Sequence, residues 1–412
     1  MINKSKYKDS PLGRIPEDWE VSLLDNLTKR GSGHTPDKEF EEYYNGGIKW
    51  ISLADSSHLD HGLIVKTEIE ISDLGIKKSS AVLHSAGTVV MSRDAGVGKS
   101  AVMGIDMAVS QHFIAWTCKN ELDNWYLYYW LQSKKEFFER QAVGSTIKTI
   151  GLPLFKKLKI QHPRFEEQQV IAQTLRTIDD VITKTTQLIA QKELRKKWLM
   201  QQLLTGKKRL KGFSGEWEQL SIDQLFNPII DINDGEVIHS IMTISAKQGL
   251  LLQNEKFDRI IAGESLKKYT QLRNGDFAYN KGNSKTYQMG CVYQLEEFPS
   301  ALVPFVYICF SPSELIDPRF YKFWFYAHGL DRQLQKVITS GARGDGLLNV
   351  NSSDFFNLKL PFPQKDEQTE ISQFLQIVDQ EIKLLKSKLE KLKQQRKGMI
   401  QQLLTGIVKL TV

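Results

Sequence analysis

The segment most suggestive of chemistry is Gly96-Val97-Gly98-Lys99-Ser100, which ends like a phosphate-binding P-loop. A P-loop also requires a glycine five residues before its Gly-Lys pair, because the backbone must turn tightly around the phosphates. Arg93 occupies that position here. The spacing therefore argues against nucleotide binding, and the segment is interpreted as a basic, glycine-bearing loop between two strands.

The sequence also gives no support for a methyltransferase or a nuclease site. Methyl transfer to a flipped adenine needs an Asn/Asp-Pro-Pro-aromatic loop, and residues 227–230 (NPII) lack the second proline and the aromatic residue. A metal-dependent nuclease needs clustered carboxylates with a lysine. The candidates Asp379, Glu381 and Lys383 lie on an expected helix and are interpreted as its solvated flank. The eight histidines show no metal-ligand spacing, so no catalytic or metal-binding residue is assigned.

Several segments instead combine cations, hydroxyls and small flexible residues, a mixture that can follow phosphates and reach base edges. The composition of each segment also fits an ordinary surface loop. We predict that they contact DNA. The candidate residues are Lys29, Arg30, His34, Thr35, Arg93, Lys99, Ser100, Ser145, Thr146 and Lys148 in the first half of the chain, and Asn280, Lys281, Asn283, Lys285 and Arg343 in the second half.

An internal repeat organises the chain and must position these loops. Residues 201–206 (QQLLTG) recur as 401–406, and Glu-Gln at 167–168 recurs at 367–368, all at an offset of 200 residues. No gap is needed between these matches, so a whole segment is duplicated. The repeat predicts the order globular part, helix, globular part, helix.

Each repeated segment is predicted to form one long helix. Its apolar residues recur in alternating steps of four and three, which is a heptad seam. Pro163 and Pro363 precede the helices, and Gly206 and Gly406 fall where a helix-ending residue is needed. About 38 residues at a rise of 1.5 Å span about 57 Å. A lone striped helix of that length needs a partner, so the two copies are expected to form an intramolecular coiled coil. Its seam residues are Ile171, Leu175, Ile178, Ile182, Ile371, Leu375, Val378, Ile382, Leu385 and Leu389.

The globular parts are each expected to be α+β, because short β-rich runs alternate with one aromatic helix. The predicted division is 1–164, 165–211, 212–363 and 364–412, with the helical spacers second and fourth. The predicted strands are 88–91, 101–103, 111–116, 276–279, 290–295 and 303–310, and the predicted aromatic helices are 124–140 and 318–337.

The composition fits a protein of two or three domains. The chain has 412 residues, of which 41% are hydrophobic and 25% charged. No apolar run approaches the roughly 20 residues of a membrane span, and the lysine-rich start does not resemble a secretory signal. A cytoplasmic location is expected. The three cysteines, Cys118, Cys291 and Cys309, favour neither a disulfide framework nor a zinc site.

Positive charge is concentrated on the two repeated segments. The net charge is +7, yet residues 184–211 hold nine Lys and Arg against one acid, and residues 381–409 hold eight against two. The rest of the chain is therefore net negative. Such segments suit a phosphate track, although cations on the outer faces also keep a coiled coil soluble.

In their order and two-fold repetition, these features resemble the specificity subunits of type I restriction-modification enzymes. The resemblance covers nearly the whole chain. The second globular part lacks clear counterparts of the Thr-Pro and Trp-Ile-Ser strings of the first. The similar strings are Pro16–Glu20, Gly33–Pro36, Gly47–Ser52, Gly87–Arg93, Val97–Lys99, Gly144–Thr146, Glu167-Gln168 and the Gln-Gln-Leu-Leu-Thr-Gly that closes both helices.

The resemblance implies an α+β fold in which two α/β target recognition domains are separated by two long antiparallel coiled-coil helices. Each domain would read one half of a bipartite asymmetric site in double-stranded DNA, with the helices as a ruler. The partners would be two methyltransferase subunits and a restriction subunit. S-adenosylmethionine, ATP and Mg are expected on those partners, and this chain is expected to hold no cofactor and to catalyse nothing.

Three alternatives stay open at this point. The chain could be a specificity subunit for a fused methyltransferase-nuclease, which the neighbouring genes would show. It could be a P-loop enzyme with a coiled-coil insert, for which ATP binding lost in Lys99→Ala would be the sign. It could also be a coiled-coil scaffold without affinity for DNA.

Overall fold

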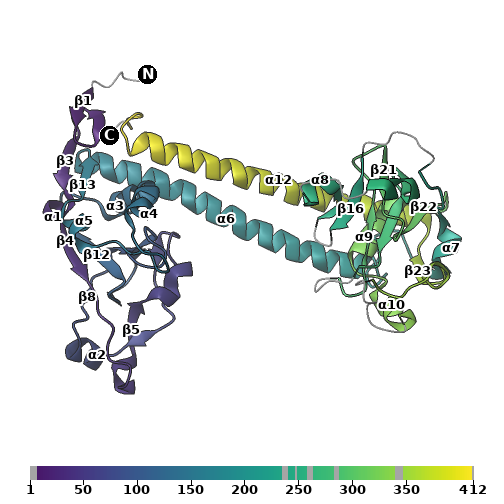
Figure 1. Cartoon of the computed structure of the whole chain (residues 1–412), viewed down its shortest axis with the longest axis horizontal. Helices are drawn as coiled ribbons and strands as arrows, with labels where there is room; N and C mark the ends of the chain where they lie inside the picture. The colour runs from purple at the N-terminus through teal and green to yellow at the C-terminus, as the bar shows by residue number, and fades with distance from the viewer. Residues whose placement is uncertain are drawn as a thin grey trace. The chain divides into compact units, whose positions relative to one another are not determined.

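The computed structural model describes residues 7–233, 240–245, 248–257, 263–282, 287–338 and 347–410. The chain divides into two compact units. Unit 1 contains residues 1–186 and 387–412, and unit 2 contains residues 187–386. Each unit combines one mixed α/β domain with part of both long helices (Figure 1), which confirms the predicted fold class.

The domain of unit 1 is built on a five-stranded sheet with the order β4-β12-β9-β10-β6. A four-stranded sheet with the order β7-β5-β11-β8 lies in the same domain, and β1-β2 and β3-β13 form separate pairs. Every residue of β9 and β10 is buried, as expected for apolar strands covered on both faces. The strands are β1 (Tyr7–Ser10), β2 (Gly13–Pro16), β3 (Glu20–Leu23), β4 (Thr28–Ser32), β5 (Tyr44–Ile51), β6 (Leu63–Ile64), β7 (Glu70–Ile71), β8 (Leu83–His84), β9 (Val89–Ser92), β10 (Ser100–Met103), β11 (Met107–Val109), β12 (Phe113–Cys118) and β13 (Lys159–His162).

The aromatic helix predicted over 124–140 is two helices. The side chain of Asp123 caps α3 by accepting the backbone N–H of Tyr126 at 2.9 Å, and α3 packs on β9 and β10. The helix breaks at Lys134, whose φ and ψ of −100° and 10° are not helical. The helices of this domain are α1 (Leu24–Leu27), α2 (Asp73–Lys78), α3 (Asn124–Ser133), α4 (Lys135–Gln141) and α5 (Leu152–Lys156).

The domain of unit 2 repeats this plan. Its four-stranded sheet has the order β15-β22-β19-β20, which matches β4-β12-β9-β10 strand for strand, and β14-β23 matches β3-β13. The strands are β14 (Glu218–Ser221), β15 (Phe226–Pro228), β16 (Met242–Ser245), β17 (Gly249–Leu252), β18 (Thr270–Arg273), β19 (Phe277–Asn280), β20 (Cys291–Gln294), β21 (Ser300–Val303), β22 (Ile308–Pro312) and β23 (Lys359–Phe362). The helices are α7 (Ile222–Leu225), α8 (Gln253–Phe257), α9 (Pro318–Tyr326), α10 (Asp331–Val337) and α11 (Ser352–Phe356).

Two elements of unit 2 that were predicted to be continuous are each interrupted in the structure. The predicted strand 303–310 is the end of β21 and the start of β22, separated by a turn in which Tyr307 donates its N–H to Pro304 at 3.0 Å. The predicted helix 318–337 is interrupted between α9 and α10, where His328 has a positive φ of 60°. A left-handed residue cannot continue a right-handed helix.

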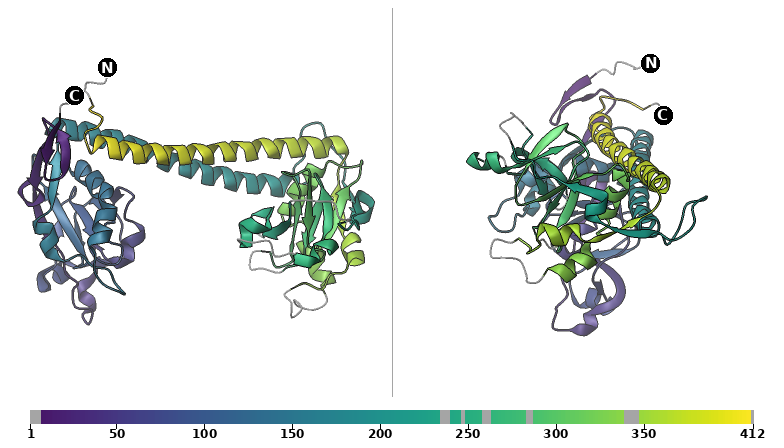
Figure 2. Two further views of the ribbon diagram at one scale, coloured as in Figure 1. Left: turned by 45° about the horizontal axis from the view of Figure 1, so that its top comes forward. Right: turned by 90° about the vertical axis from the view of Figure 1, so that its right-hand side faces the viewer.

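The two long helices confirm the prediction from the repeat. Helix α6 (Phe165–Leu203) and helix α12 (Lys365–Leu403) have 39 residues each. Within each unit they run side by side and antiparallel (Figures 1 and 2). Gly206 and Gly406 have φ of 70° and 72°, the left-handed conformation expected shortly after a helix end.

The heptad seam is buried most deeply where the helices meet the domains. Ile171 and Leu175 are fully buried in the core of unit 1, and Ile371 and Leu375 in that of unit 2. The middle of the seam is less protected. Ile178 and Ile382 are buried, whereas Ile182, Val378, Leu385 and Leu389 are half-buried.

The repeated Glu-Gln pair has a structural explanation in its glutamine. The fully buried Gln168 accepts the backbone N–H of Asp123 at 2.9 Å and donates to the carbonyl of Pro163 at 3.0 Å. Gln368 makes the same two bonds in unit 2, to Asp317 at 2.8 Å and to Pro363 at 2.8 Å. Each glutamine therefore ties the first turn of a long helix to the segment that caps the aromatic helix of its domain.

The cysteines are unpaired, as predicted. Burial raises the pKa of the Cys291 thiol to about 11, so it stays protonated and unreactive near neutral pH. Among the described residues no cluster of three or more potential metal ligands occurs, and none of the described helices is long and apolar enough to cross a membrane.

Candidate nucleic-acid interface

Three loops of unit 1 meet at one edge of its five-stranded sheet. Strands β4 and β9 end at this edge, and β10 and β12 begin there, because Ile114 pairs with Ser32, Phe113 with Ser92, and Ser100 with Met91. The loops are 33–36 after β4, 93–99 between β9 and β10, and 110–112 before β12. Segments that are distant in sequence thus lie together through strand register alone.

A fourth loop joins them from the segment before α5. Ile150 donates its N–H to the carbonyl of Arg93 at 2.9 Å, and Val143 and Thr149 exchange backbone bonds of 3.0 and 2.9 Å. The residues between them form an exposed tip. We call residues 33–36, 93–99, 110–112 and 143–149 the loop edge of unit 1. The tip carries three of the predicted residues, Ser145, Thr146 and Lys148, all exposed.

The loop edge brings together seven of the ten residues predicted in the first half of the chain: His34, Thr35, Arg93, Lys99, Ser145, Thr146 and Lys148. Lys29 and Arg30 lie elsewhere, because they pair with Thr117 and Trp116 away from the edge. Arg30 also forms an ion pair with Asp25 at 3.3 Å.

The prediction for Ser100 is wrong, because its side chain is fully buried. Its hydroxyl accepts the Gln132 amide at 2.8 Å, and its N–H is donated to Asp60 at 3.0 Å. Ser100 therefore supports the sheet and does not face a ligand.

The P-loop hypothesis is also wrong. In a P-loop the Lys-Ser pair opens a helix whose N-terminus faces the phosphates, whereas Ser100 opens strand β10. The Lys99 ammonium is held by the carbonyl of Ser56 at 3.0 Å. Gly96 and Gly98 have φ of 121° and 83°, which a hairpin loop requires.

Sequence reasoning missed a hydrogen-bonded group of polar side chains at the edge. The Thr35 hydroxyl donates to Gln111 Oε1 at 2.6 Å, Gln111 Nε2 lies 3.4 Å from His112 Nε2, and His112 Nδ1 lies 2.8 Å from Asp94 Oδ2. The sequence offered one signal for this group: the run 111–116 begins with two polar residues, Gln111 and His112. That run was interpreted as strand, whereas β12 begins at Phe113.

Unit 2 builds the same edge of its sheet with different residues. Asn280 ends β19, and Leu348 donates its N–H to the carbonyl of Lys281 at 2.9 Å, as Ile150 does to Arg93 in unit 1. Both Asn280 and Lys281 are half-buried. The predicted residues Asn283, Lys285 and Arg343 lie outside the described part of the chain.

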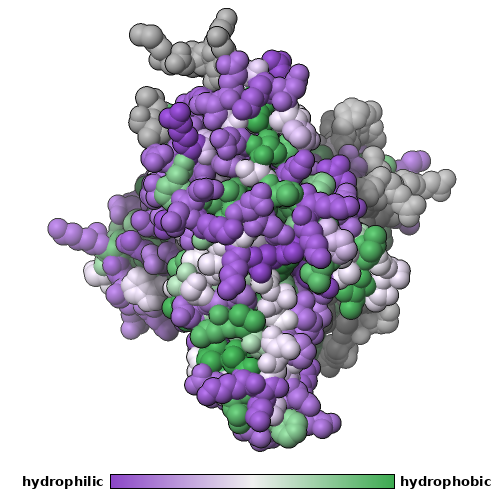
Figure 3. All heavy atoms as spheres, turned by 90° about the vertical axis from the view of Figure 1, so that its left-hand side faces the viewer, coloured by the Kyte–Doolittle hydropathy of each residue, from purple (hydrophilic) through white to green (hydrophobic). Residues whose placement is uncertain are grey.

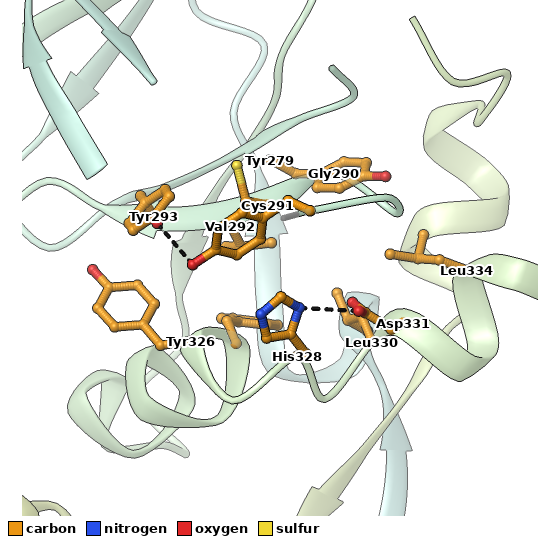
Figure 4. A pocket seen from close by; sticks show the side chains of 12 residues that line it. Tyr279, Gly290, Cys291, Val292, Tyr293, Tyr326, His328, Leu330, Asp331 and Leu334 are labelled. Atoms are coloured by element: carbon orange, nitrogen blue, oxygen red, sulfur yellow. Dashed lines mark hydrogen bonds and ion pairs between the residues drawn. The ribbon is translucent and has the colours of Figure 1, made fainter. Parts of the chain in front are cut away.

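A small hollow beside this edge is lined mainly by aromatic and apolar side chains (Figure 4). His328 Nδ1 lies 3.0 Å from Asp331 Oδ2, and the His328 ring stacks on Tyr287 with centroids 4.6 Å apart. Tyr287 precedes β20, so the stack fixes the chain that enters that strand. Cys291 also lines the hollow, but burial raises the pKa of its thiol to about 11. The thiol therefore stays protonated near neutral pH, and the hollow is interpreted as structural support.

The predicted flank of α12 is occupied by ion pairs. Asp379 binds Lys196 at 2.5 Å, and Glu381 binds Lys192 at 2.5 Å. These carboxylates are neutralised across the helix pair, which agrees with their interpretation as a solvated flank.

Figure 3 looks onto unit 1 and shows a mainly hydrophilic face with smaller hydrophobic areas, the largest toward its bottom.

Comparison with known proteins decides the family. Residues 16–194 and 216–394 each match the type I restriction modification DNA specificity domain. The chain belongs to this family. Each match covers one domain and most of the helix that follows it, so the family repeat coincides with the structural repeat.

Individual specificity subunits are similar over different lengths. The type I restriction enzyme MjaVIII specificity subunit of Methanocaldococcus jannaschii is 24% identical, over 99% of this chain and 97% of that protein. The MjaIX specificity subunit of the same organism is 29% identical over 43% of this chain and 42% of that protein, so the chain matches less than half of its length. The crystal structure of a type I restriction-modification S subunit from M. genitalium has the same fold, with a TM-score of 0.56 and 15% identity over 96% of this chain and 97% of that one.

Proposed function

We propose that this chain is the sequence-specific DNA-recognition subunit of a type I restriction-modification complex. Each unit would read one half of a bipartite site through the loop edge of its sheet. The observation that carries the proposal is the repetition of one sheet edge in both units, with seven predicted contact residues gathered on it in unit 1.

The chemistry of that edge suits a polyanion. Its exposed tip and its cations suit phosphates, while Gln111 and His112 offer hydrogen-bonding groups for base edges. Because the edge of unit 2 carries different side chains on the same strands, the two units would read different sequences. The site would then be asymmetric.

The catalytic steps are assigned to partner proteins in this proposal. Two methyltransferase subunits would bind S-adenosylmethionine, and a restriction subunit would use ATP and Mg. This chain would supply sequence recognition and a docking platform and perform no reaction. A fused methyltransferase-nuclease as partner would leave the role of this chain unchanged.

The experiment is co-expression with candidate methyltransferase subunits, followed by sequencing of methylated adenines in host DNA. The expected result is a bipartite motif in which only one half changes when residues 212–363 are exchanged for those of another family member. Absence of a motif, together with a DNA affinity that does not fall steeply with salt, would instead indicate a scaffold.

A further inference from the structure

The side chains of Thr35, Gln111, His112 and Asp94 form one continuous hydrogen-bonded chain at the loop edge of unit 1. It begins at a half-buried hydroxyl, passes through the exposed Gln111, and ends at Asp94, which is 7% exposed. We name these four side chains the relay. A buried carboxylate beneath a DNA-binding surface repels phosphates and so weakens binding. Its presence here therefore calls for a specific role.

The carboxylate at one end fixes the direction of every bond in the relay. Asp94 can only accept, so His112 Nδ1 carries the proton and donates to it. A neutral ring then has its lone pair on Nε2, which accepts an N–H from Gln111. The Gln111 oxygen therefore faces Thr35, which agrees with the hydroxyl that donates to it at 2.6 Å.

The backbone around the relay is held from several sides. A Cβ on Gly33 would lie 1.5 Å from the carbonyl oxygen of Val109, so only glycine permits β4 to leave the sheet against the segment before Gln111. The carbonyl of His34 accepts the Trp50 indole N–H at 3.2 Å, and that of Pro36 accepts the Tyr44 hydroxyl at 2.6 Å. Thr35 thus sits between two fixed carbonyls.

Arg93 and Asp94 are fixed in the same way. Arg93 donates its N–H to the carbonyl of His112 at 3.0 Å, and the Ser92 hydroxyl donates to the carbonyl of Asp94 at 2.5 Å. The Arg93 guanidinium lies 3.6 Å from the second oxygen of Asp94. The Arg93 cation offsets part of the charge of the Asp94 carboxylate. It lies beside Oδ1 and leaves Oδ2 of Asp94 to accept the bond from His112.

The oriented amide of Gln111 retains one N–H and one oxygen lone pair. That pair of groups matches adenine, which presents N7 as acceptor and N6–H as donor in the major groove, and glutamine binds both at once. Building on the proposed function, we propose that Gln111 reads an adenine in the half-site of unit 1, and that His112 and Asp94 are positioning residues that fix which way its amide points. No described residue group in the edge of unit 2 repeats the relay: Tyr307, which precedes β22, directs its hydroxyl to Thr243 at 3.2 Å.

The test uses the chain assembled with its methyltransferase subunits and a duplex library whose two half-sites are randomised. Bound and unbound DNA are sequenced for the wild type and for Gln111→Ala, Gln111→Glu and Asp94→Asn. Gln111→Ala should relax the preference at a single A·T pair by roughly tenfold to a hundredfold, which is the usual discrimination of a two-bond contact. Gln111→Glu should favour cytosine there, whose N4 group only donates.

Asp94→Asn keeps the shape of the side chain but can also present an N–H to His112, so it frees the amide of Gln111 to rotate. It should weaken the preference at the same base pair and at no other, a change that a merely structural role would not produce. Lys148→Met is the matched control on the same edge. It should lower affinity for all sequences alike and reduce the salt dependence.

The outcomes separate this inference from the proposed function. A bipartite preference in the wild type that none of the Gln111 variants changes would overturn the inference and leave the proposed function standing. A uniform loss of affinity in Gln111→Ala would also overturn it, since that result assigns the residue to phosphate contact. If the wild type selects no bipartite sequence, both fail.

Discussion

The guanidinium of Arg396 binds the carboxylate of Asp179 across the helix pair of unit 1, and the hydroxyl of Tyr129 donates to the same carboxylate at 2.9 Å. The repeat places an equivalent pair in unit 2, where Lys196 binds Asp379 at 2.5 Å. Each residue is exactly one repeat, 200 positions, from its counterpart of the same charge. The duplication therefore preserved a cross-helix ion pair in both units.

Replacing Arg396 with methionine should lower the free energy of unfolding by about 2 kcal/mol, because the partly buried carboxylate of Asp179 loses its charged partner. Lys196→Met should cost less, since Asp379 is more exposed, at 39% against 28% for Asp179. Urea denaturation of both variants measures the difference. A double-mutant cycle with Asp179→Asn should give a coupling energy clearly above zero; additive losses would mean that the pair contributes nothing.

Replacing Gln168 with alanine should destabilise unit 1 by about 2 kcal/mol, because it leaves the N–H of Asp123 buried without a partner and removes one of the bonds to the carbonyl of Pro163. Gln168→Glu is the matched variant. It retains the acceptor for Asp123 but loses the donor to Pro163, and it should also destabilise. Gln368→Ala should reproduce the loss in unit 2, and hydrogen exchange at the capped helices α3 and α9 would locate each effect. Equal exchange in wild type and variants would contradict the bonding described.

Glu167 should behave opposite to its repeat counterpart Glu367. Burial raises the pKa of the Glu167 carboxyl, and nearby Lys409 offsets this only in part. A carboxyl whose pKa is higher in the folded chain costs stability once it is charged. Glu167→Gln should therefore raise the unfolding temperature at pH 7, with a gain that shrinks as the pH falls through the folded pKa and vanishes near pH 4.

The control for that experiment is Glu367→Gln. Glu367 accepts two bonds from Arg209, each 2.6 Å long, so this variant should lower stability at pH 7. If both glutamine variants shift the unfolding temperature in the same direction, the explanation from burial is wrong.

Asp60 provides a pH dependence of the other sign. Burial raises its pKa, but bonds from Lys135 at 2.6 Å, Gln132 at 2.6 Å and the N–H of Ser100 outweigh burial and hold the pKa below its ordinary value. The resulting stability is fully present above about pH 4 and is lost as the pH falls through the folded pKa. Asp60→Asn should therefore cost about 2 kcal/mol at pH 7, and its deficit in thermal unfolding should shrink as the pH falls through the folded pKa of Asp60; a constant deficit would point to packing instead.

The sequence predicted the long helices well because their signals are local and repeated: a heptad seam, a preceding proline and a following glycine. It predicted the aromatic helices but not their breaks at Lys134 and His328, since neither residue is a strong helix breaker and the break depends on tertiary packing. The loop edge was foreseen only as separate loops. Their convergence depends on strand register, which long-range pairing sets.

The polar residues show the same limit. Ser100 and Lys99 are neighbours in one basic loop, and only the structure distinguishes the buried hydroxyl from the half-exposed ammonium. Gln111 and His112 belong to no sequence motif. Their role depends on hydrogen bonds to distant residues: Thr35 lies 76 residues from Gln111, and Asp94 lies 18 residues from His112. A single sequence has no means of joining such positions.

The assignment of residues 387–410 to unit 1 has a consequence for biosynthesis. Leu403 and Leu404 lie in the same buried core as Trp19 and Ile171, so this core stays open while the ribosome is still translating the middle of the chain. Unit 2 is a continuous stretch and can close earlier. A polypeptide interrupted before position 387 would carry one finished unit and one whose apolar interior is accessible to proteases and chaperones.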